Sequence, residues 1–284
     1  MKILLFGSQG MLGNQFFMDY SSEFHIIPLS HFHIDFLKPE NIEGVIAEHA
    51  PDLVINTVAW TNVDSAENPK NHDAVFTINA DSPAEIARIC EKRKIPFFHI
   101  STDFVFSGKE VAIFQEDSPK NPCNVYGKSK AQGEEEVLKY KTSRVFRTAW
   151  LYGEYGPNFV QQIVHILKNP PRNGANIKGV NNQWGSPTSC KTVGEVLAQA
   201  VRNPDKFPTG IYHAVNDGAV SRLKWIEKIA ALVGYKNPIE PVSSDAFVQM
   251  AKRPVSSVLK NTKMPALKSW EEALEEYLEA NKKG

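Results

Sequence analysis

Cysteine is scarce in this sequence. Three cysteines, Cys90, Cys123 and Cys190, stand far apart in 284 residues, and their number is odd. This pattern is typical of free thiols in a reducing compartment, and it argues against a disulfide scaffold or a cysteine-based zinc site. The histidines show no metal-ligand spacing with carboxylates or cysteines either. We therefore predict no bound metal and a cytoplasmic location.

The sequence also lacks an excess of charge of either sign. Lysine plus arginine and aspartate plus glutamate both number 32, so no global field attracts nucleic acid or an anionic membrane. No uninterrupted apolar stretch approaches the roughly 18 residues of a membrane-spanning helix. The first predicted strand begins at Lys2, which leaves no room for a signal peptide before it. We expect a globular protein that binds neither nucleic acid nor a membrane.

At its start, the chain has an apolar strand that runs into three evenly spaced glycines. Residues 2–6 are followed by Gly7, Gly10 and Gly13, and an amphipathic stretch comes next. In dinucleotide-binding folds such glycines permit a tight turn, let the backbone approach a diphosphate, and let the helix pack on the strand. The helix N-terminus then favours the negative charge of the phosphates. We predict that a cofactor is bound by Gly7, Gln9, Gly10, Met11, Leu12 and Gly13.

Strand and helix patterns alternate through the first half of the chain. Apolar runs of strand length cover 24–29, 53–59, 96–100 and 143–149, and helical patterns cover 39–49, 71–94 and 126–140. The alternation predicts an α/β fold, a Rossmann-like doubly wound parallel sheet whose ligands bind at the carboxyl ends of the strands.

The second half is less regular and suggests a smaller C-terminal substrate-binding domain. Helical patterns cover 158–167, 188–201, 221–233 and 268–278. We expect residues 1–150 to form the NAD(P)-binding domain and residues 151–284 mainly the substrate domain. The two are predicted to interleave, with later strands near 176–182 and 210–215 rejoining the sheet.

A candidate catalytic group lies just after the strand at 96–100. This strand ends near Thr102, and Tyr126 and Lys130 follow at four-residue spacing, which places them on one face of a helix. A lysine cation near a tyrosine is expected to lower the pKa of the phenol from about 10 towards the working range. A Tyr-x-x-x-Lys motif alone occurs often by chance. Its weight comes from the glycine turn and the hydroxyl-bearing strand end that precede it.

Seven segments together resemble the dTDP-4-dehydrorhamnose reductase family, within the extended short-chain dehydrogenase/reductase superfamily. The closest are 101–106 and 124–130, and 54–67, 147–152, 158–159, 181–188 and 252–254 agree along the rest of the chain. The resemblance implies reduction by NADPH or NADH of the C4 ketone of a nucleotide-linked 6-deoxy-4-ketohexose. The expected substrate is dTDP-4-dehydro-L-rhamnose, which becomes dTDP-L-rhamnose. The resemblance also implies a role for each catalytic residue. Tyr126 protonates the forming alkoxide, Lys130 lowers the pKa of Tyr126 and holds the cofactor ribose, and Thr102 hydrogen-bonds the carbonyl oxygen.

The resemblance also implies two sets of binding residues. Those for the cofactor, besides the glycine turn, Tyr126 and Lys130, are Asp35, Phe36, Asn56, Ala59, Trp60 and Asn79. Those for the substrate are Thr102, Asp103, Phe104, Trp150, Asn158, Gln183 and Arg253. Packing alone could explain Trp60 and Trp150, Asn79 could brace the sheet, and Arg253 could be a solvated surface residue instead of a diphosphate ligand.

The end of the second predicted strand bears on cofactor choice. No acid stands there before Asp35 to repel a 2′-phosphate, so NADPH is favoured over NADH. Three positions depart from the family pattern. Phe104 replaces a tyrosine, Asn182 replaces an aspartate, and Gln15 stands where some members have a glutamate for a metal-bridged dimer. We therefore expect a monomer or a weak homodimer.

Two other functions stay open. One is a 4,6-dehydratase or epimerase of the same superfamily, although such dehydratases carry an Asp-Glu pair after the threonine and this chain has Asp103 and Phe104. The other is a non-catalytic regulatory subunit like that of methionine adenosyltransferase, which descends from the same family. Retention of Thr102, Tyr126 and Lys130 together favours an enzyme.

Overall fold

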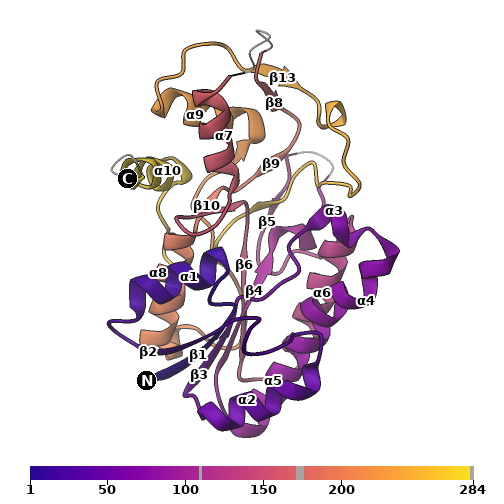
Figure 1. The fold of residues 1–284 in the computed structure, drawn as a ribbon, viewed down its shortest axis with the longest axis vertical. Coiled ribbons are helices and arrows are strands. Elements are labelled where there is room, and N and C mark those ends of the chain that lie inside the picture. Colours follow the sequence, from indigo (N-terminus) through magenta and orange to yellow (C-terminus); the bar gives the residue numbers. More distant parts are fainter. Residues whose placement is uncertain (109–110, 171–175, 282–284) are drawn as a thin grey trace.

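A six-stranded parallel sheet forms the base of the molecule (Figure 1). The computed structural model describes residues 1–108, 111–170 and 176–281. Within the sheet the strand order is β11-β6-β4-β3-β1-β2, and every neighbouring pair is parallel. The strands are β1 (Lys2–Phe6), β2 (His25–Leu29), β3 (Leu53–Asn56), β4 (Phe97–Thr102), β6 (Ser143–Thr148) and β11 (Gly210–His213). The predicted Rossmann-like α/β fold is confirmed.

Helices cover both faces of this sheet. On one face, Ile3 and Leu5 pack with α1 (Met11–Tyr20) and α8 (Cys190–Arg202). On the other, Leu4 and Phe6 pack with three further helices, which lie at the bottom and lower right of Figure 1. These are α2 (Ile42–His49), α5 (Ser82–Arg93) and α6 (Val125–Val137). In β1 and β3 both alternating sets of side chains are buried, which explains why these two central strands are almost entirely apolar.

The helix expected over 71–94 is divided into three parts. After η2 (Pro69–Asn71), α4 (His72–Phe76) leads into a π-helical segment, η3 (Thr77–Asp81), and then into α5. Pro83 in the first turn of α5 has no N–H to continue an α-helical hydrogen-bond ladder. The backbone carbonyl of Asn79 lies so close to α6 that a Cβ on Gly133 would be 2.1 Å from its oxygen. A π-helical widening at this point lets the two helices touch, and such bulges often adjoin functional sites.

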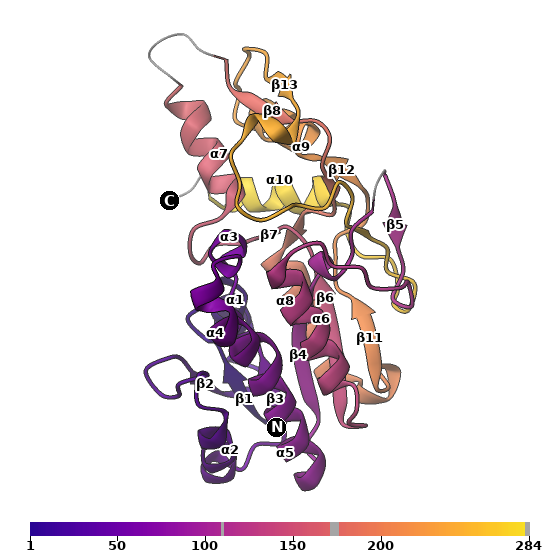
Figure 2. The ribbon, with the colours of Figure 1, turned by 90° about the vertical axis from the view of Figure 1, so that its right-hand side faces the viewer.

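A second, smaller unit stands above the sheet in Figures 1 and 2. Its core joins α7 (Phe159–Lys168), α9 (Arg222–Leu232) and α10 (Trp270–Ala280) around the buried Trp225. Its short strands are β7 (Leu151–Tyr152), β8 (Lys178–Val180), β9 (Trp184–Gly185), β10 (Thr188–Ser189), β12 (Val220–Ser221) and β13 (Glu240–Val242). Three further elements are α3 (Val63–Ala66), β5 (Ile113–Phe114) and β14 (Val258–Leu259). β5 and β14 pair with each other. The 3-10 turns are η1 (Pro39–Asn41), η4 (Asp103–Val105), η5 (Pro204–Lys206) and η6 (Ser244–Ala246).

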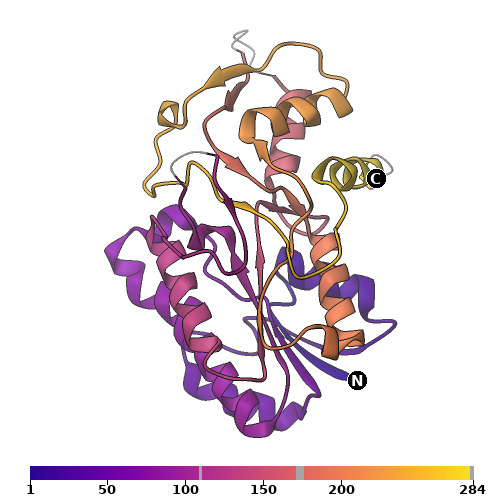
Figure 3. The same ribbon diagram turned by 180° about the vertical axis from the view of Figure 1, so that it is seen from behind.

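The chain passes repeatedly between the two units. α8 and β11 return to the sheet after β10, and β11 pairs with β6. The strand expected near 176–182, however, does not rejoin the sheet: β8 pairs with β13 in the upper unit. There Gly179 lies directly on Leu223 of α9, so this three-residue strand belongs to the core of the smaller unit. Seen from behind (Figure 3), the segment between β13 and α10 descends beside the sheet before it returns, and Lys263 Nζ donates to the carbonyl of Ile211 in β11.

None of the helices in the described ranges combines the length and the hydropathy needed to cross a membrane.

Candidate active site

A cleft of about 1110 Å³ runs across the carboxyl ends of the parallel strands. The strand order reverses between β1 and β3, since the chain adds β2 on one side of β1 and all later strands on the other. Ligands of doubly wound sheets bind at such a reversal. The cleft is lined by the glycine turn after β1, the segment after β3, the end of β4, α6 and the loop after β6.

The glycine turn closes the floor of the cleft. Gly7 has φ +86°, and a Cβ there would be 2.5 Å from Thr57 Oγ1. A Cβ on Gly13 would lie 2.2 Å from the Gly7 carbonyl oxygen, so α1 packs on the strand only because this position is glycine. α1 begins at Met11 after Gly10, and no side chain caps its N–H groups. A turn so narrow, with open amides at a helix N-terminus, fits the diphosphate of a dinucleotide.

The adenosine end of the cleft lies beyond β2. Ser30, His31, Asp35 and Phe36 line it, and the Leu37 N–H donates to Asp35 Oδ1 at 2.9 Å. No carboxylate lies directly at the end of β2, where an acid would exclude a 2′-phosphate. The lining therefore accepts NADP as readily as NAD.

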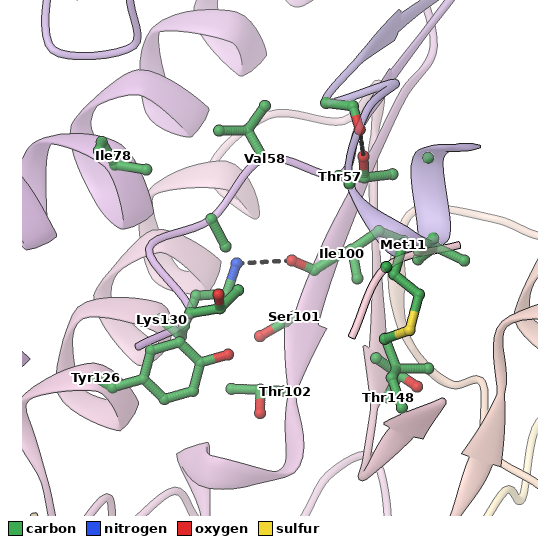
Figure 4. Close-up of a pocket in the computed structure, with 18 of the residues that line it drawn as sticks. Met11, Thr57, Val58, Ile78, Ile100, Ser101, Thr102, Tyr126, Lys130 and Thr148 are labelled. Atoms are coloured by element: carbon green, nitrogen blue, oxygen red, sulfur yellow. Dashed lines mark hydrogen bonds between the residues drawn. The ribbon is translucent and has the colours of Figure 1, made fainter. Parts of the chain in front are cut away.

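Tyr126 and Lys130 both face the cleft from α6, as Figure 4 shows. Asn124 caps this helix, its Oδ1 accepting from Gly127 N at 2.7 Å. Gly127 lies against η4, and a Cβ there would be 2.3 Å from the Phe104 carbonyl oxygen. The close contact fixes the first turn of α6 beside the end of β4. The phenol of Tyr126 is therefore directed towards Ser101 and Thr102.

The structure corrects the expected effect of lysine on the tyrosine. Burial raises the pKa of Tyr126 to about 12, and the nearby Thr102 hydroxyl only partly offsets this. Lys130 Nζ instead bonds to the Ile100 carbonyl oxygen at 2.7 Å and to His99 Nε2 at 3.2 Å. Burial also lowers the pKa of Lys130 to about 8, so the side chain is still mostly protonated at neutral pH, but its hydrogen bonds run to Ile100 and His99. Tyr126 is thus a protonated phenol at neutral pH, the form needed to donate a proton.

Thr102 and Asp103 form a small buried network. Thr102 Oγ1 donates to Asp103 Oδ1 at 3.0 Å and accepts from Phe104 N at 3.2 Å. Ser257 Oγ donates to the other carboxylate oxygen at 2.5 Å. Burial raises the pKa of Asp103 to about 6, although both hydroxyls favour the carboxylate. Asp103 therefore orients Thr102 and ties it to the segment from the C-terminal unit.

A second pocket of about 770 Å³ opens from the cleft and shares Phe104, Trp150 and Arg222 with it. Arg222 is the first residue of α9, and its guanidinium carbon lies 3.7 Å from the centroid of the Trp150 ring and 4.7 Å from that of Phe159. Aromatic faces attract such a cation and hold it in one place. Burial lowers the pKa of Arg222 to about 10, so it remains charged at neutral pH. A single cation therefore stands where the two cavities meet.

Arg253 and Gln183 also line this second pocket. Arg253, however, already has a partner: its guanidinium bonds to Asp64 Oδ2 at 2.8 Å and to the Ala251 carbonyl at 3.1 Å. Asp64 belongs to α3, so this ion pair joins the two units.

Four sequence-predicted site residues lie behind the cavities instead of lining them. Asn79 accepts from Trp60 N and donates to Ser129 Oγ, Trp60 Nε1 donates to Ser65 Oγ, and Asn56 Oδ1 accepts from Val58 N. Asn158 caps α7 and donates to the Gly153 carbonyl. The contacts of Asn79 indicate that it braces the wall of the cleft. The other predicted residues line the cleft, the second pocket or both.

Sequence reasoning missed Arg222 and gave His99 no role beyond rejecting it as a metal ligand. The only local signal for Arg222 was a basic residue directly after the Ser221 cap. His99 lies inside an apolar strand, and nothing in its sequence neighbours shows that Lys130 would reach it. Among the described residues, no cluster of histidine, cysteine and carboxylate side chains could hold a metal.

The glycine turn on a parallel sheet, with a Tyr-x-x-x-Lys helix beside the strand ends, defines the extended short-chain dehydrogenase/reductase class. Within it, the chain belongs to the RmlD family, because the family model described as the RmlD substrate binding domain matches residues 1–283. It is 32% identical to the spore coat polysaccharide biosynthesis protein SpsK of Bacillus subtilis, over 98% of this chain and 97% of that protein. It is also 32% identical to a dTDP-4-dehydrorhamnose reductase of Streptomyces griseus, over 98% of this chain and 93% of that enzyme.

Solved structures agree. A dTDP-4-dehydrorhamnose reductase from Clostridium acetobutylicum superposes with a TM-score of 0.91 at 30% identity, covering 99% of this chain and 100% of that one. The Bacillus anthracis enzyme of the same name, solved in complex with NADP, also gives 0.91 at 29% identity, with 98% and 99% coverage.

Proposed function

We propose that this protein uses NADPH to reduce the C4 ketone of a dTDP-linked 6-deoxy-4-ketohexose, converting dTDP-4-dehydro-L-rhamnose to dTDP-L-rhamnose. The observation that carries the proposal is that Thr102, Tyr126 and Lys130 together line the cofactor cleft, from which the second pocket opens. Relatives support the substrate class. Besides the enzymes above, a Streptomyces antibioticus protein that is 33% identical is named a probable dTDP-4,6-dihydroxy-2-methyloxan-3-one 4-ketoreductase.

The chemistry assigned to the chain is proton transfer and alignment. When bound, the reduced nicotinamide supplies the hydride that the ketone carbon receives. Tyr126 donates its phenolic proton to the oxygen that gains charge, and Thr102 turns its hydroxyl from Asp103 to the same oxygen. Lys130, which lines the cleft, would hold the ribose of the cofactor and so keep the reacting atoms aligned.

The second pocket is proposed to take the nucleotide part of the substrate. The ring of Trp150 and the cation of Arg222 stand at its entrance, where the diphosphate would lie beside the sugar. Arg222 presents a planar fork suited to phosphate oxygens, whereas Arg253 is engaged by Asp64. We therefore assign the main diphosphate contact to Arg222 and a supporting one to Arg253.

The proposed assembly and location follow from Gln15 and from the cysteines. Gln15 is buried within α1 and donates to Asp19, which favours a monomer or a weak homodimer over a metal-bridged dimer. The three free thiols favour a reducing compartment, and so the cytoplasm.

The decisive experiment measures the oxidation of NADPH, by the loss of its absorbance, with dTDP-4-dehydro-L-rhamnose (dTDP-4-keto-6-deoxy-L-mannose) made in situ. We expect turnover by the wild type and a loss of at least about 10²-fold in Tyr126→Phe, because the proton donor is removed while the ring remains. Tyr140→Phe, in the turn after α6 and outside the lining of both cavities, is the matched control and should keep full activity. Absence of turnover with every keto-sugar nucleotide tried, together with tight binding to another protein, would instead favour the regulatory-subunit function.

A further inference from the structure

The buried carboxylate of Asp103 receives one hydroxyl from each of the two units. Thr102 Oγ1, at the end of β4, donates to Oδ1 at 3.0 Å, and Ser257 Oγ, from the C-terminal unit, donates to Oδ2 at 2.5 Å. Asp103 is 2% exposed and Ser257 is 3% exposed, so solvent has little access to either oxygen. The carboxylate therefore depends mainly on these two side-chain donors.

The two hydrogen bonds differ in length. An O–H group that donates to a carboxylate ordinarily lies about 2.5–2.7 Å from the acceptor oxygen. The bond from Ser257 falls in this range, whereas the bond from Thr102 is longer, at 3.0 Å. Ser257 is therefore the stronger partner of Asp103, and the hydroxyl of Thr102 is held more loosely.

The position of Ser257 is fixed by the C-terminal unit. Its N–H donates to the carbonyl of Trp184 in β9 at 3.0 Å, and β14, which follows it directly, pairs with β5. The same segment brings Arg253 to the second pocket, and Ser257 lines that pocket too. The hydroxyl of Ser257 thus reaches Asp103 from the wall of the pocket proposed for the nucleotide.

Thr102 can turn its hydrogen without moving its oxygen. Its Oγ1 also accepts from Phe104 N at 3.2 Å, so rotation about the Cβ–Oγ1 bond redirects only the hydrogen. The phenol of Tyr126 is directed towards Thr102 (Figure 4). A ketone oxygen that accepts from Tyr126 would therefore lie beside Thr102, where the turned hydroxyl donates to it as well.

This turn leaves Asp103 with one hydroxyl donor fewer. A buried carboxylate that has lost both hydroxyls would be costly, so its hold on the hydrogen of Thr102 depends on whether Ser257 is there. Two other groups face Asp103. Arg222 of α9 favours the carboxylate by its charge, and Tyr126 of α6, a protonated phenol, keeps its proton for the ketone.

We propose that Ser257 is a positioning residue that holds the Asp103 carboxylate from the C-terminal unit and so frees the hydroxyl of Thr102 to turn to the substrate. This inference rests on the proposed function for the role of Thr102, but the bond between Ser257 and Asp103 does not depend on any activity. Without Ser257 the carboxylate retains Thr102 as its hydroxyl donor, and the ketone oxygen loses one of its two hydrogen bonds.

Steady-state kinetics of Ser257→Ala with NADPH and dTDP-4-dehydro-L-rhamnose tests the proposal. We expect kcat to fall about 10-fold and the KM for the sugar nucleotide to change by less than about 2-fold, because the lost bond acts on the reacting oxygen and not on binding. In a Thr102→Val background, which already lacks the hydroxyl, Ser257→Ala should lower kcat further by less than about 2-fold.

Ser256→Ala is the matched control. Ser256 is also buried and directly precedes Ser257, but its hydroxyl donates to the carbonyl of Ala112 at 2.6 Å. This variant should keep the kcat and the KM of the wild type.

The bond between Ser257 and Asp103 can also be tested without substrate, by nuclear magnetic resonance of the full chain with ¹³C-aspartate labels. With the signal assigned by Asp103→Asn, we expect a carboxyl pKa of about 6 in the wild type. In Ser257→Ala this pKa should be higher by about half a pH unit or more, because a donor to the carboxylate is lost. Ser256→Ala should leave it unchanged.

Three results would overturn the inference. They are a kcat that stays unchanged in Ser257→Ala, an equal loss of kcat in the wild-type and Thr102→Val backgrounds, and an Asp103 pKa that does not move in Ser257→Ala. If the protein reduces no keto-sugar nucleotide while the carboxyl titration behaves as expected, only the proposed function fails.

Discussion

The guanidinium of Arg222 is held by aromatic rings rather than by a carboxylate. Its guanidinium carbon lies over the faces of Trp150 and Phe159, and no ion pair of Arg222 is found within the described part of the chain, whereas Arg253 is committed to Asp64. A cation held this way can meet an anionic ligand without first breaking an ion pair. Such a residue acts on substrate affinity more than on the chemical step.

Arg222→Met should therefore raise the KM for the sugar nucleotide at least 10-fold and change the KM for NADPH by less than about 2-fold. Ten-fold corresponds to about 1.4 kcal/mol, the low end for a charged hydrogen bond. Steady-state kinetics with each substrate varied in turn makes the measurement. Arg202→Met is the control, because Arg202 also stacks on aromatic rings, those of Tyr20 and Phe24, but far from both cavities. Equal effects on both KM values would contradict the assignment.

Asp103 makes stability depend on pH. Burial raises its pKa from 3.8 to about 6, so between these values the folded protein keeps a proton that the unfolded chain has released. Its stabilising contribution is complete below about pH 4 and is lost as the pH rises through about 6, at most about 3 kcal/mol.

Asp103→Asn should remove this loss, so its stability relative to the wild type should increase from pH 4 to pH 7. Urea unfolding at several pH values measures the difference. The exposed Asp205→Asn serves as the control and should show a flat difference over the same range. A flat difference for Asp103→Asn too would mean that the carboxyl is ionised throughout.

Residues close in sequence were the predictable part of the site. The glycine turn and the Tyr-x-x-x-Lys pair depend on spacing within one turn or one helix, so the sequence alone places them. Arg222 and His99 depend on how distant segments meet: α9 returns over Trp150 after some seventy residues, and β4 passes beneath α6. No local sequence pattern indicates which distant segments pack together.

At the scale of elements, the first turn of α6 sets the position of Tyr126. Two glycines in helices make a direct comparison. A Cβ on Gly127 would lie 2.3 Å from a backbone oxygen, whereas a Cβ on Gly44 in α2 would meet nothing within 4 Å.

Gly127→Ala should displace α6 from η4, with a loss of activity of at least 10-fold and a lower melting temperature. Gly44→Ala should keep activity and gain up to about 1 kcal/mol in stability, because alanine favours a helix. Thermal unfolding and NADPH oxidation of the two variants check both outcomes. Full activity in Gly127→Ala would mean that the helix does not need this contact to position its tyrosine.

The helix at 71–94 and the strand near 176–182 show why elements are harder to predict than motifs. Periodicity over 71–94 is helical throughout, but Pro83 and the contact of the Asn79 carbonyl with Gly133 force a π-helical segment. The apolar residues near 176–182 suit a strand in either core, and only the packing of Gly179 on Leu223 decides which.

At the scale of the whole molecule, Asp64 fastens the C-terminal unit to the sheet-bearing one. Its carboxylate accepts from Arg253 and, at 2.9 Å, from Ala251 N, and these bonds lower the pKa of Asp64 despite its partial burial. The ion pair is partly exposed, so its direct contribution to stability is small.

Asp64→Ala should therefore leave the melting temperature within about 2 °C but raise the KM for the sugar nucleotide several-fold, because Arg253 and Pro254 line the second pocket. Asp245→Ala, in the exposed η6 that precedes this segment, is the control. Kinetics and thermal unfolding together separate this result from general destabilisation, which would lower the melting temperature and the activity together.

The interleaved path of the chain has a consequence for how the two units could ever be separated. A fragment that stops at residue 150 would keep the glycine turn and Tyr126 yet forfeit β11 and α8. The sheet would then have a bare edge at β6, and Phe16, Phe98 and Phe146 would lose their cover. Such a piece would aggregate instead of binding nucleotide. The region that recognises the sugar is therefore not a detachable module, and grafting a new specificity onto this scaffold means editing loops in place.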